Sequence, residues 1–176
     1  MHPLLVLALL PVLPLAGILL ALYICLCLLF IIPGTLVRGS WLKRRFRREH
    51  GRRGKFILFV YSNSPNWQQY IEENIFPQIG DVSVVLNWSE RSKWKLNDPW
   101  EAQILRHWGG DREFNPIAII IPLRGRVRVV RFWQAFRDYK HGKDSTLRDA
   151  EGRMSEAVEV IRNRMTGRPA TPIEQG

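Results

Sequence analysis

The sequence predicts an α/β protein in which a single N-terminal transmembrane helix precedes a small domain of alternating strands and helices. Three observations lead to this prediction. Residues 4–32 contain no charged side chain and consist mostly of Leu, Ile, Val, Ala and Phe. A dense basic segment follows this run, and short apolar runs then alternate with segments of helical periodicity. About 110 residues carry these elements, which is enough for one compact core.

The apolar run is expected to be a retained membrane anchor over residues 1–34. About 20 apolar residues at roughly 1.5 Å each cross a bilayer, so the run is long enough even if Pro11 and Pro14 kink it. A cleaved secretory signal needs a basic start, a short apolar stretch and a small-residue cleavage site, and the sequence has none of these. The Pro33-Gly34 pair predicts the end of the helix.

Residues 35–55 form a basic collar with nine bases and one acid, Glu49, so it carries +8 of the formal net charge of +10. Basic flanks stay on the cytoplasmic side, so we expect the N-terminus outside and the domain inside, in an inner or plasma membrane. The collar is also expected to attract anionic lipid headgroups, although a purely topogenic role explains the same charge. The residues assigned to the membrane surface are Arg38, Trp41, Lys43, Arg44, Arg45, Arg47, Arg48, Arg52 and Arg53.

The domain contains no thiol, because both cysteines, Cys25 and Cys27, lie in the anchor. Residues two apart on a helix point to different faces, so a disulfide between these two is not expected. Disulfide bonding, thiol catalysis and cysteine-based metal binding are therefore excluded in the domain.

The first half of the domain, over residues 56–97, predicts two strands with a helix between them. Residues 55–61 form a short run of aromatic and branched side chains, typical of a buried strand. Cap residues and a proline at 62–66 then predict a helix that runs to about Pro77. Residues 82–86 predict the second strand, and residues 87–97 predict a polar connecting loop that contains tryptophan.

The second half predicts a helix, a hairpin and a final helix. Asp98, Pro99 and Glu101 resemble a capping box with proline at its first helical position, and Gly109-Gly110 predicts the end of that helix. Residues 115–121 and 126–132 predict the two strands of a hairpin. Helical spacing of apolar residues predicts the final helix, and residues 167–176 predict a loose tail. The spaced residues are Met154, Ala157, Val158, Ile161 and Met165.

Two stretches, Asn63-Ser64-Pro65-Asn66 and Asn115-Pro116, fall within an order of elements that is similar to the thioredoxin fold over residues 56–166. In that family a motif with two cysteines opens the first helix, and a cis-proline begins a strand of the terminal hairpin. Asn63 and Asn66 occupy the cysteine positions and cannot form the attacking thiolate. The resemblance therefore implies a thioredoxin-like β-α-β-α-β-β-α domain without redox activity. An α/β sandwich unrelated to thioredoxin is the alternative.

No catalytic residue, cofactor or metal site is predicted. Motifs for a serine nucleophile, a phosphate loop and a dinucleotide site are missing from the sequence. The histidines are scattered without ligand spacing to an acid or a thiol; they are His2, His50, His107 and His141. We therefore expect no enzyme activity, no cofactor and no small-molecule substrate.

Tryptophan is concentrated in the middle of the domain, and Trp94 between Lys93 and Lys95 is a residue that we expect to be hard to bury. Tryptophan beside basic residues is typical of protein interfaces. The predicted partner-binding residues are Trp88, Trp94, Lys93 and Lys95 in the domain, and Gly17 and Ala21 in the anchor. Nucleic acid is a less favoured partner, because acids nearly balance the bases of the domain.

These observations favour a non-catalytic accessory or assembly subunit that is anchored beside other membrane protein subunits. Two alternatives stay open. The first is a membrane-bound enzyme with a non-thiol site made of separated polar residues; these are Asn63, Asn66, Asp98 and Arg124. In the second alternative, the basic collar carries the function, as an electrostatic tether to lipid or nucleic acid.

Overall fold

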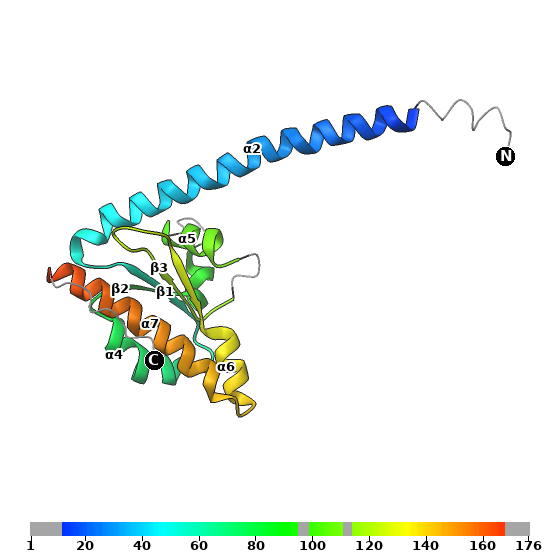
Figure 1. Cartoon of the computed structure of the whole chain (residues 1–176). Helices are drawn as coiled ribbons and strands as arrows, with labels where there is room; N and C mark the ends of the chain where they lie inside the picture. The colour runs from blue at the N-terminus through cyan, green and yellow to red at the C-terminus, as the bar shows by residue number, and fades with distance from the viewer. Residues whose placement is uncertain (1–11, 95–98, 111–113, 168–176) are drawn as a thin grey trace, which may run out of the picture. The chain divides into compact units, whose positions relative to one another are not determined.

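The computed structural model describes residues 12–94, 99–110 and 114–167. It is a mixed α/β structure with one four-stranded sheet (Figure 1). The chain divides into two compact units, Met1–Trp41 and Leu42–Gly176. The first unit contains most of a long helix, and the second contains the sheet and the other described helices.

Helix α2 (Val12–Glu49) contains most of the uncharged run and continues into the basic collar. A window of 18 residues reaches a mean hydropathy of 3.0, and none of that window is buried. The helix is therefore long and apolar enough to cross a bilayer. A 3-10 turn, η1 (Gly51–Arg53), follows it.

The prediction that Pro33-Gly34 ends this helix is wrong, because α2 continues through both residues to Glu49. Proline inside a helix removes one hydrogen bond, since it has no N–H group. Ending the helix there leaves four carbonyl groups without intrahelical partners. In apolar surroundings the four unpartnered carbonyls cost more free energy than the one missing bond.

The last two turns of α2 are part of the domain core. Leu42 and Phe46 lie one helical turn apart, and both are completely buried. They belong to the apolar cluster on one face of the sheet. The second compact unit accordingly begins at Leu42, inside the segment that the sequence analysis assigned to the collar.

Four strands form the sheet in the order β2-β1-β3-β4. Strand β1 pairs in parallel with β2 and antiparallel with β3, and β3 pairs antiparallel with β4, as expected for the hairpin. Three strands lie inside their predicted segments and start two residues later than predicted, and β2 extends one residue beyond its predicted end; the strands are β1 (Ile57–Tyr61), β2 (Ser83–Asn87), β3 (Ile117–Ile120) and β4 (Arg128–Arg131). The Asn115–Pro116 peptide bond before β3 is cis, as the thioredoxin resemblance predicts.

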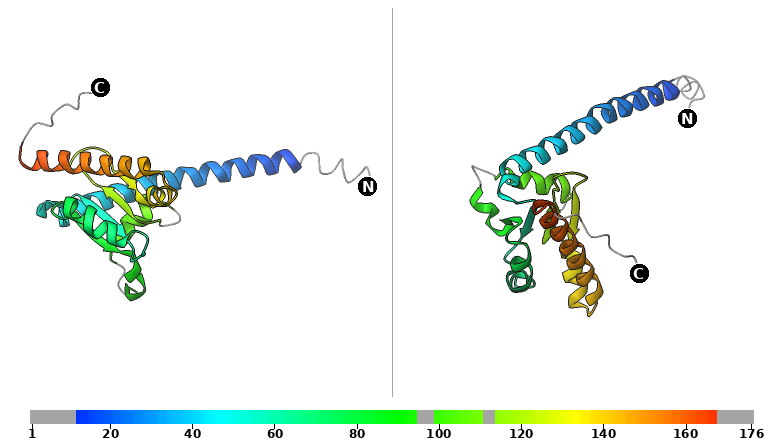
Figure 2. Two further views of the ribbon diagram at one scale, coloured as in Figure 1. Left: turned by 90° about the horizontal axis from the view of Figure 1, so that it is seen from below. Right: turned by 60° about the vertical axis from the view of Figure 1, so that its left-hand side comes forward.

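Helices cover both faces of the sheet, with α4 and α7 on one side and α5 on the other (Figure 1). Helices α6 and α7 lie side by side (Figure 2). The first face carries α3 (Gln68–Tyr70), the π-helical turn η2 (Ile71–Ile75), α4 (Phe76–Ile79), α6 (Phe132–Lys140) and α7 (Asp144–Met165). The second face carries the 3-10 turns of η3 (Trp88–Trp94), α5 (Glu101–Trp108) and the end of α2.

The predicted final helix is confirmed by α7, which buries four of its five spaced apolar residues and leaves Met165 50% exposed. Helix α6 was not predicted. Its buried residues Phe132, Ala135 and Phe136 follow β4 directly, so no turn signal separates the helix from the strand. Helix α5 is followed by Gly109, as expected, but its predicted cap, Asp98, lies outside the described residues.

Replacing Phe46 with Ala is expected to destabilise the domain by about 3–5 kcal/mol, because it removes a fully buried aromatic ring from the core. Arg48→Ala, at an exposed position two residues further along α2, should change stability by less than about 0.5 kcal/mol. Chemical unfolding of the full chain in detergent measures both variants. Equal stability of the two would contradict the assignment of Phe46 to the core.

An ion pair connects α7 to the turn before β2. Arg162 donates hydrogen bonds to both carboxylate oxygens of Asp81, at 2.7 and 2.9 Å, and to the Gln78 carbonyl oxygen at 2.8 Å. The hydrogen bonds from Arg162 lower the pKa of Asp81 below its ordinary value of 3.8. The resulting stabilisation is therefore present above that value and is lost as the pH falls through the lower pKa of the folded state.

Asp81→Asn is expected to lower the melting temperature at neutral pH, and the difference from the parent should shrink as the pH falls below 3.8. The effect corresponds to about 1 kcal/mol or less, because the Arg162 and Asp81 side chains are 45% and 56% exposed. Thermal unfolding across the acid range tests this. A melting-temperature difference that grows as the pH falls would contradict a stabilising ion pair between Asp81 and Arg162.

Candidate functional site

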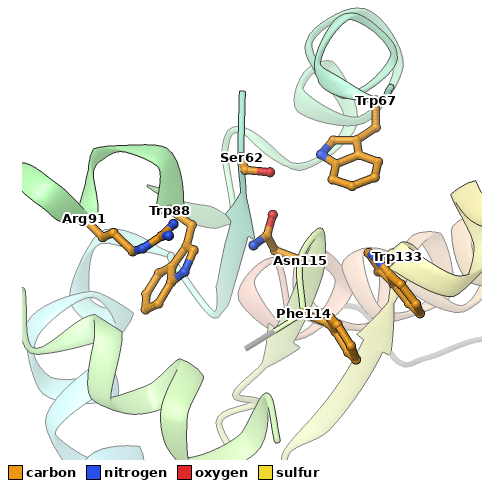
Figure 3. Close-up of a pocket in the computed structure, with 7 residues that line it drawn as sticks. All are labelled: Ser62, Trp67, Trp88, Arg91, Phe114, Asn115 and Trp133. Carbon is orange, nitrogen blue, oxygen red and sulfur yellow. The ribbon is translucent and has the colours of Figure 1, made fainter. Parts of the chain in front are cut away.

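A cavity of about 370 Å³ lies at one end of the sheet (Figure 3). The antiparallel pairing of β1 and β3 brings the end of β1 beside the start of β3. The carboxyl ends of β2 and β4 lie at the same end of the sheet. Five connecting segments or helix starts therefore contribute side chains; these are Ser62, Trp67, Trp88, Arg91, Phe114, Asn115 and Trp133.

Four of the seven residues that line the cavity are aromatic. Phe114 and Trp133 stack with their ring centroids 4.3 Å apart and their planes inclined by 8°. The Arg137 guanidinium lies 4.9 Å above the Trp133 ring. Phe114 is 39% exposed, so the outer part of this wall is open to a binding partner. Aromatic rings beside convergent polar groups are found in binding sites.

Two buried polar atoms of the cavity residues have no hydrogen-bond partner among the described residues. They are the indole Nε1 of Trp67, a donor, and the side-chain Oδ1 of Asn115, an acceptor. Ser62 and Asn115 lie between Trp67 and Trp133 on one side and Trp88 and Arg91 on the other (Figure 3). Leaving a buried donor or acceptor unpaired costs about 1–3 kcal/mol, so both atoms are suited to hydrogen bonds with a bound group.

The cavity offers binding groups rather than a pair for acid–base chemistry. Among its described lining residues there is no His, Cys, Asp or Glu. Ser62 therefore has no adjacent base in the lining that would activate its hydroxyl group. Tyr61, the residue before Ser62, has its pKa raised by burial and by the charges of Glu72 and Glu90, so it stays protonated at neutral pH.

The tryptophans predicted to bind partners are less exposed than the sequence analysis expected. Trp88 is only 5% exposed and belongs to the core cluster, although one side of it reaches the cavity. Trp94 is partly buried, and its ring centroid lies 5.5 Å from that of Trp88. Lys93 is exposed and pairs with Glu90 at 3.3 Å, and Lys95 lies outside the described residues. The prediction missed that η3 turns both indole rings toward the sheet.

The collar residues fall into two groups. Lys43 donates a hydrogen bond to the Gly125 carbonyl oxygen at 2.6 Å, and Arg47 donates one to the Pro122 carbonyl oxygen. Arg45 pairs with Glu49 at 2.8 Å. The remaining members are exposed; they are Arg38, Trp41, Arg44, Arg48, Arg52 and Arg53. In the anchor, Gly17 and Ala21 are exposed, and a Cβ atom at Gly17 would meet nothing within 4 Å.

The polar residues proposed for an alternative enzyme site do not converge. Asn63 accepts a hydrogen bond from Asn87 at 2.8 Å, and Asn66 accepts one from Lys140, both at the cavity end of the sheet. Arg124 follows β3 and therefore lies at the opposite end. Asp98 lies outside the described residues.

Sequence reasoning missed one cluster of ionisable side chains. His50 Nε2 lies 2.9 Å from Glu101 Oε1, and with Glu49 these residues place three potential metal-ligand atoms within 4.8 Å of one another. Glu49 already pairs with Arg45. The His50 ring stacks on the Trp100 ring, with their centroids 5.7 Å apart. The cluster therefore connects the end of α2 to the start of α5. No sequence signal indicates it, because 51 residues separate His50 from Glu101.

Comparisons with protein-family models, with curated proteins and with solved structures give no match.

Trp88 is a core residue, whereas Phe114 lies at the surface of the cavity, so their removal should affect stability differently. Trp88→Ala is expected to cost about 3–5 kcal/mol of stability, because the ring is almost completely buried. Phe114→Ala, at a 39% exposed ring, should cost less than about 1 kcal/mol. Chemical unfolding in detergent compares the two. Similar losses would mean that Phe114 is a core residue and not an open wall of the cavity.

Proposed function

We propose that this protein is a membrane-anchored accessory or assembly subunit that binds another membrane protein through the aromatic cavity of its domain. The observation that carries the proposal is the cavity itself, in which an unpaired buried donor and an unpaired buried acceptor lie among aromatic rings. A peptide group supplies the complementary acceptor and donor. The preferred occupant is therefore an extended segment of the partner protein.

The proposal includes a thioredoxin-like domain without redox function. The element order around the sheet supports it, because a parallel β1–β2 pair is followed by an antiparallel β3–β4 hairpin and a long final helix. Asn63 and Asn66 stand where the resemblance puts cysteines, so thiol chemistry has no nucleophile there. The lining of the cavity supports a non-catalytic role, since its residues include no acid–base pair.

The proposed location is a single pass through the inner or plasma membrane, with the domain on the cytoplasmic side. The exposed apolar surface of α2 supports the membrane span. The basic collar supports the orientation, because basic flanks remain on the cytoplasmic side. Anchoring keeps the cavity close to other membrane proteins, which is where an assembly subunit acts.

Photo-crosslinking from the cavity wall tests the proposal. A benzophenone amino acid replaces Phe114 in the full chain within its native membrane, and a second variant carries it at Tyr139. Tyr139 is 47% exposed and is not among the cavity residues, which makes it a matched control. We expect a membrane protein adduct from position 114 and none from position 139.

Equal adducts from both positions, or none from either, would contradict the proposal. Migration of the mildly solubilised protein as a lone monomer would count against it as well. A partner that stays bound after Trp133→Ser would show that the cavity is not the binding surface.

A further inference from the structure

The turn between β3 and β4 lies at the end of the sheet opposite the aromatic cavity. It comprises residues 122–126, in which Leu123, Arg124 and Arg126 are exposed. Two bases from the end of α2 hold its backbone, since Lys43 and Arg47 donate hydrogen bonds to the carbonyl oxygens of Gly125 and Pro122. These two bases of the collar therefore position the turn.

A hollow of about 410 Å³ opens beside this turn and is lined by Leu123, Arg124 and Arg164. Arg164 comes from the last turn of α7 and donates a hydrogen bond to the Arg124 carbonyl oxygen at 3.4 Å. No carboxylate in the described part of the chain pairs with either guanidinium group. Two arginines beside one hollow without a carboxylate favour an anion, and a phosphate group accepts their planar donors in pairs.

The positive charge around the turn is crowded as well as unpaired. Burial lowers the pKa of Lys43, and the neighbouring charge of Arg47 lowers it further. Burial also lowers the pKa of Arg47. An anion at the turn would relieve the repulsion among these cations.

The hollow also has an apolar side. Leu123 is 48% exposed, and a small apolar depression beside it is lined in part by Phe56 and Ile161. An exposed leucine beside arginines is typical of surfaces that lie at the boundary between headgroups and acyl chains. A free phosphate ion has no apolar group that could contact this side of the hollow.

Chain connectivity keeps the turn near the bilayer. Lys43, which holds the turn, lies six positions after Val37, the last residue before the first charged residue of the collar. Even a fully extended chain spans at most about 20 Å over that length. Anionic headgroups are therefore the abundant source of phosphate within reach.

We infer that Arg124 and Arg164 form a binding site for the phosphate of an anionic phospholipid, whose acyl chain begins at Leu123. Lys43 and Arg47 are positioning residues of this site, because they hold the turn that carries Arg124. The site adds bases from the domain to the exposed arginines of the collar. The inference is independent of the proposed partner binding, since the two surfaces lie at opposite ends of the sheet.

Native mass spectrometry of the full chain in detergent tests the inference, with equal amounts of phosphatidylglycerol and phosphatidylcholine added. The double variant Arg124→Gln/Arg164→Gln should lower the affinity of the most tightly held phosphatidylglycerol by about 25-fold, because each base contributes roughly fivefold. The control variant Arg148→Gln/Arg153→Gln removes the same charge from exposed positions at the other end of α7. It should leave the affinity unchanged.

Arg124→Lys/Arg164→Lys keeps the charge and should retain most of the preference for phosphatidylglycerol over phosphatidylcholine. Equal losses in the two glutamine variants, or no loss in either, would overturn the inference in favour of diffuse attraction to the collar. Displacement of phosphatidylglycerol by inorganic phosphate alone would assign the site to a soluble ligand and overturn the lipid assignment. Crosslinking from position 114 should be unaffected by either glutamine variant.

Discussion

Burial of both faces of the central strands β1 and β3 is the constraint on which the rest of the domain depends. Both strands are almost entirely buried, so each face of the sheet needs a helical layer to exclude water. One face is covered by α4, α6 and α7. The other is covered by the eight-residue helix α5 and the 3-10 turns of η3, and Leu42 and Phe46 of α2 complete the cover. The end of the long apolar helix is therefore a structural part of the domain.

The same sheet separates two surfaces of different chemistry. Antiparallel pairing of β1 and β3 gathers the aromatic cavity residues at one end and the turn with Arg124 at the other. The first surface has aromatic rings with unpaired neutral donors and acceptors, which suit a peptide. The second has two guanidinium groups that pair with no carboxylate in the described part of the chain, beside a hollow with an apolar side where we infer a phospholipid. Under the two proposals above, the domain would contact a protein at one end of the sheet and a phospholipid at the other, without competition between them.

Much of the fold could be predicted because its strands are local features. The runs that became β1 and β3 are apolar without interruption, and the hairpin follows a short turn. Helix α6 was missed because Phe132 begins it directly after β4, so the strand and helix patterns merge. The burial of Leu42 and Phe46 was missed because the surrounding bases dominate that segment. In the candidate site, Trp88 was named for the wrong reason, since it is mainly a core residue.

Local sequence patterns are enough to predict the apolar N-terminal helix, the basic collar, the lack of thiols in the domain and the positions of the strands. Each of these features is set by residues that are close together in the sequence. Hydrophobic periodicity also indicates which side of a single helix or strand is buried. Packing of distant segments, in contrast, lets Lys43 and Arg47 hold a turn and brings Arg164 to the carbonyl oxygen of Arg124, 40 residues away. It also brought five segments together around the cavity. Periodicity cannot identify which elements pack against one another, because that depends on the shape and volume of side chains far apart in the chain.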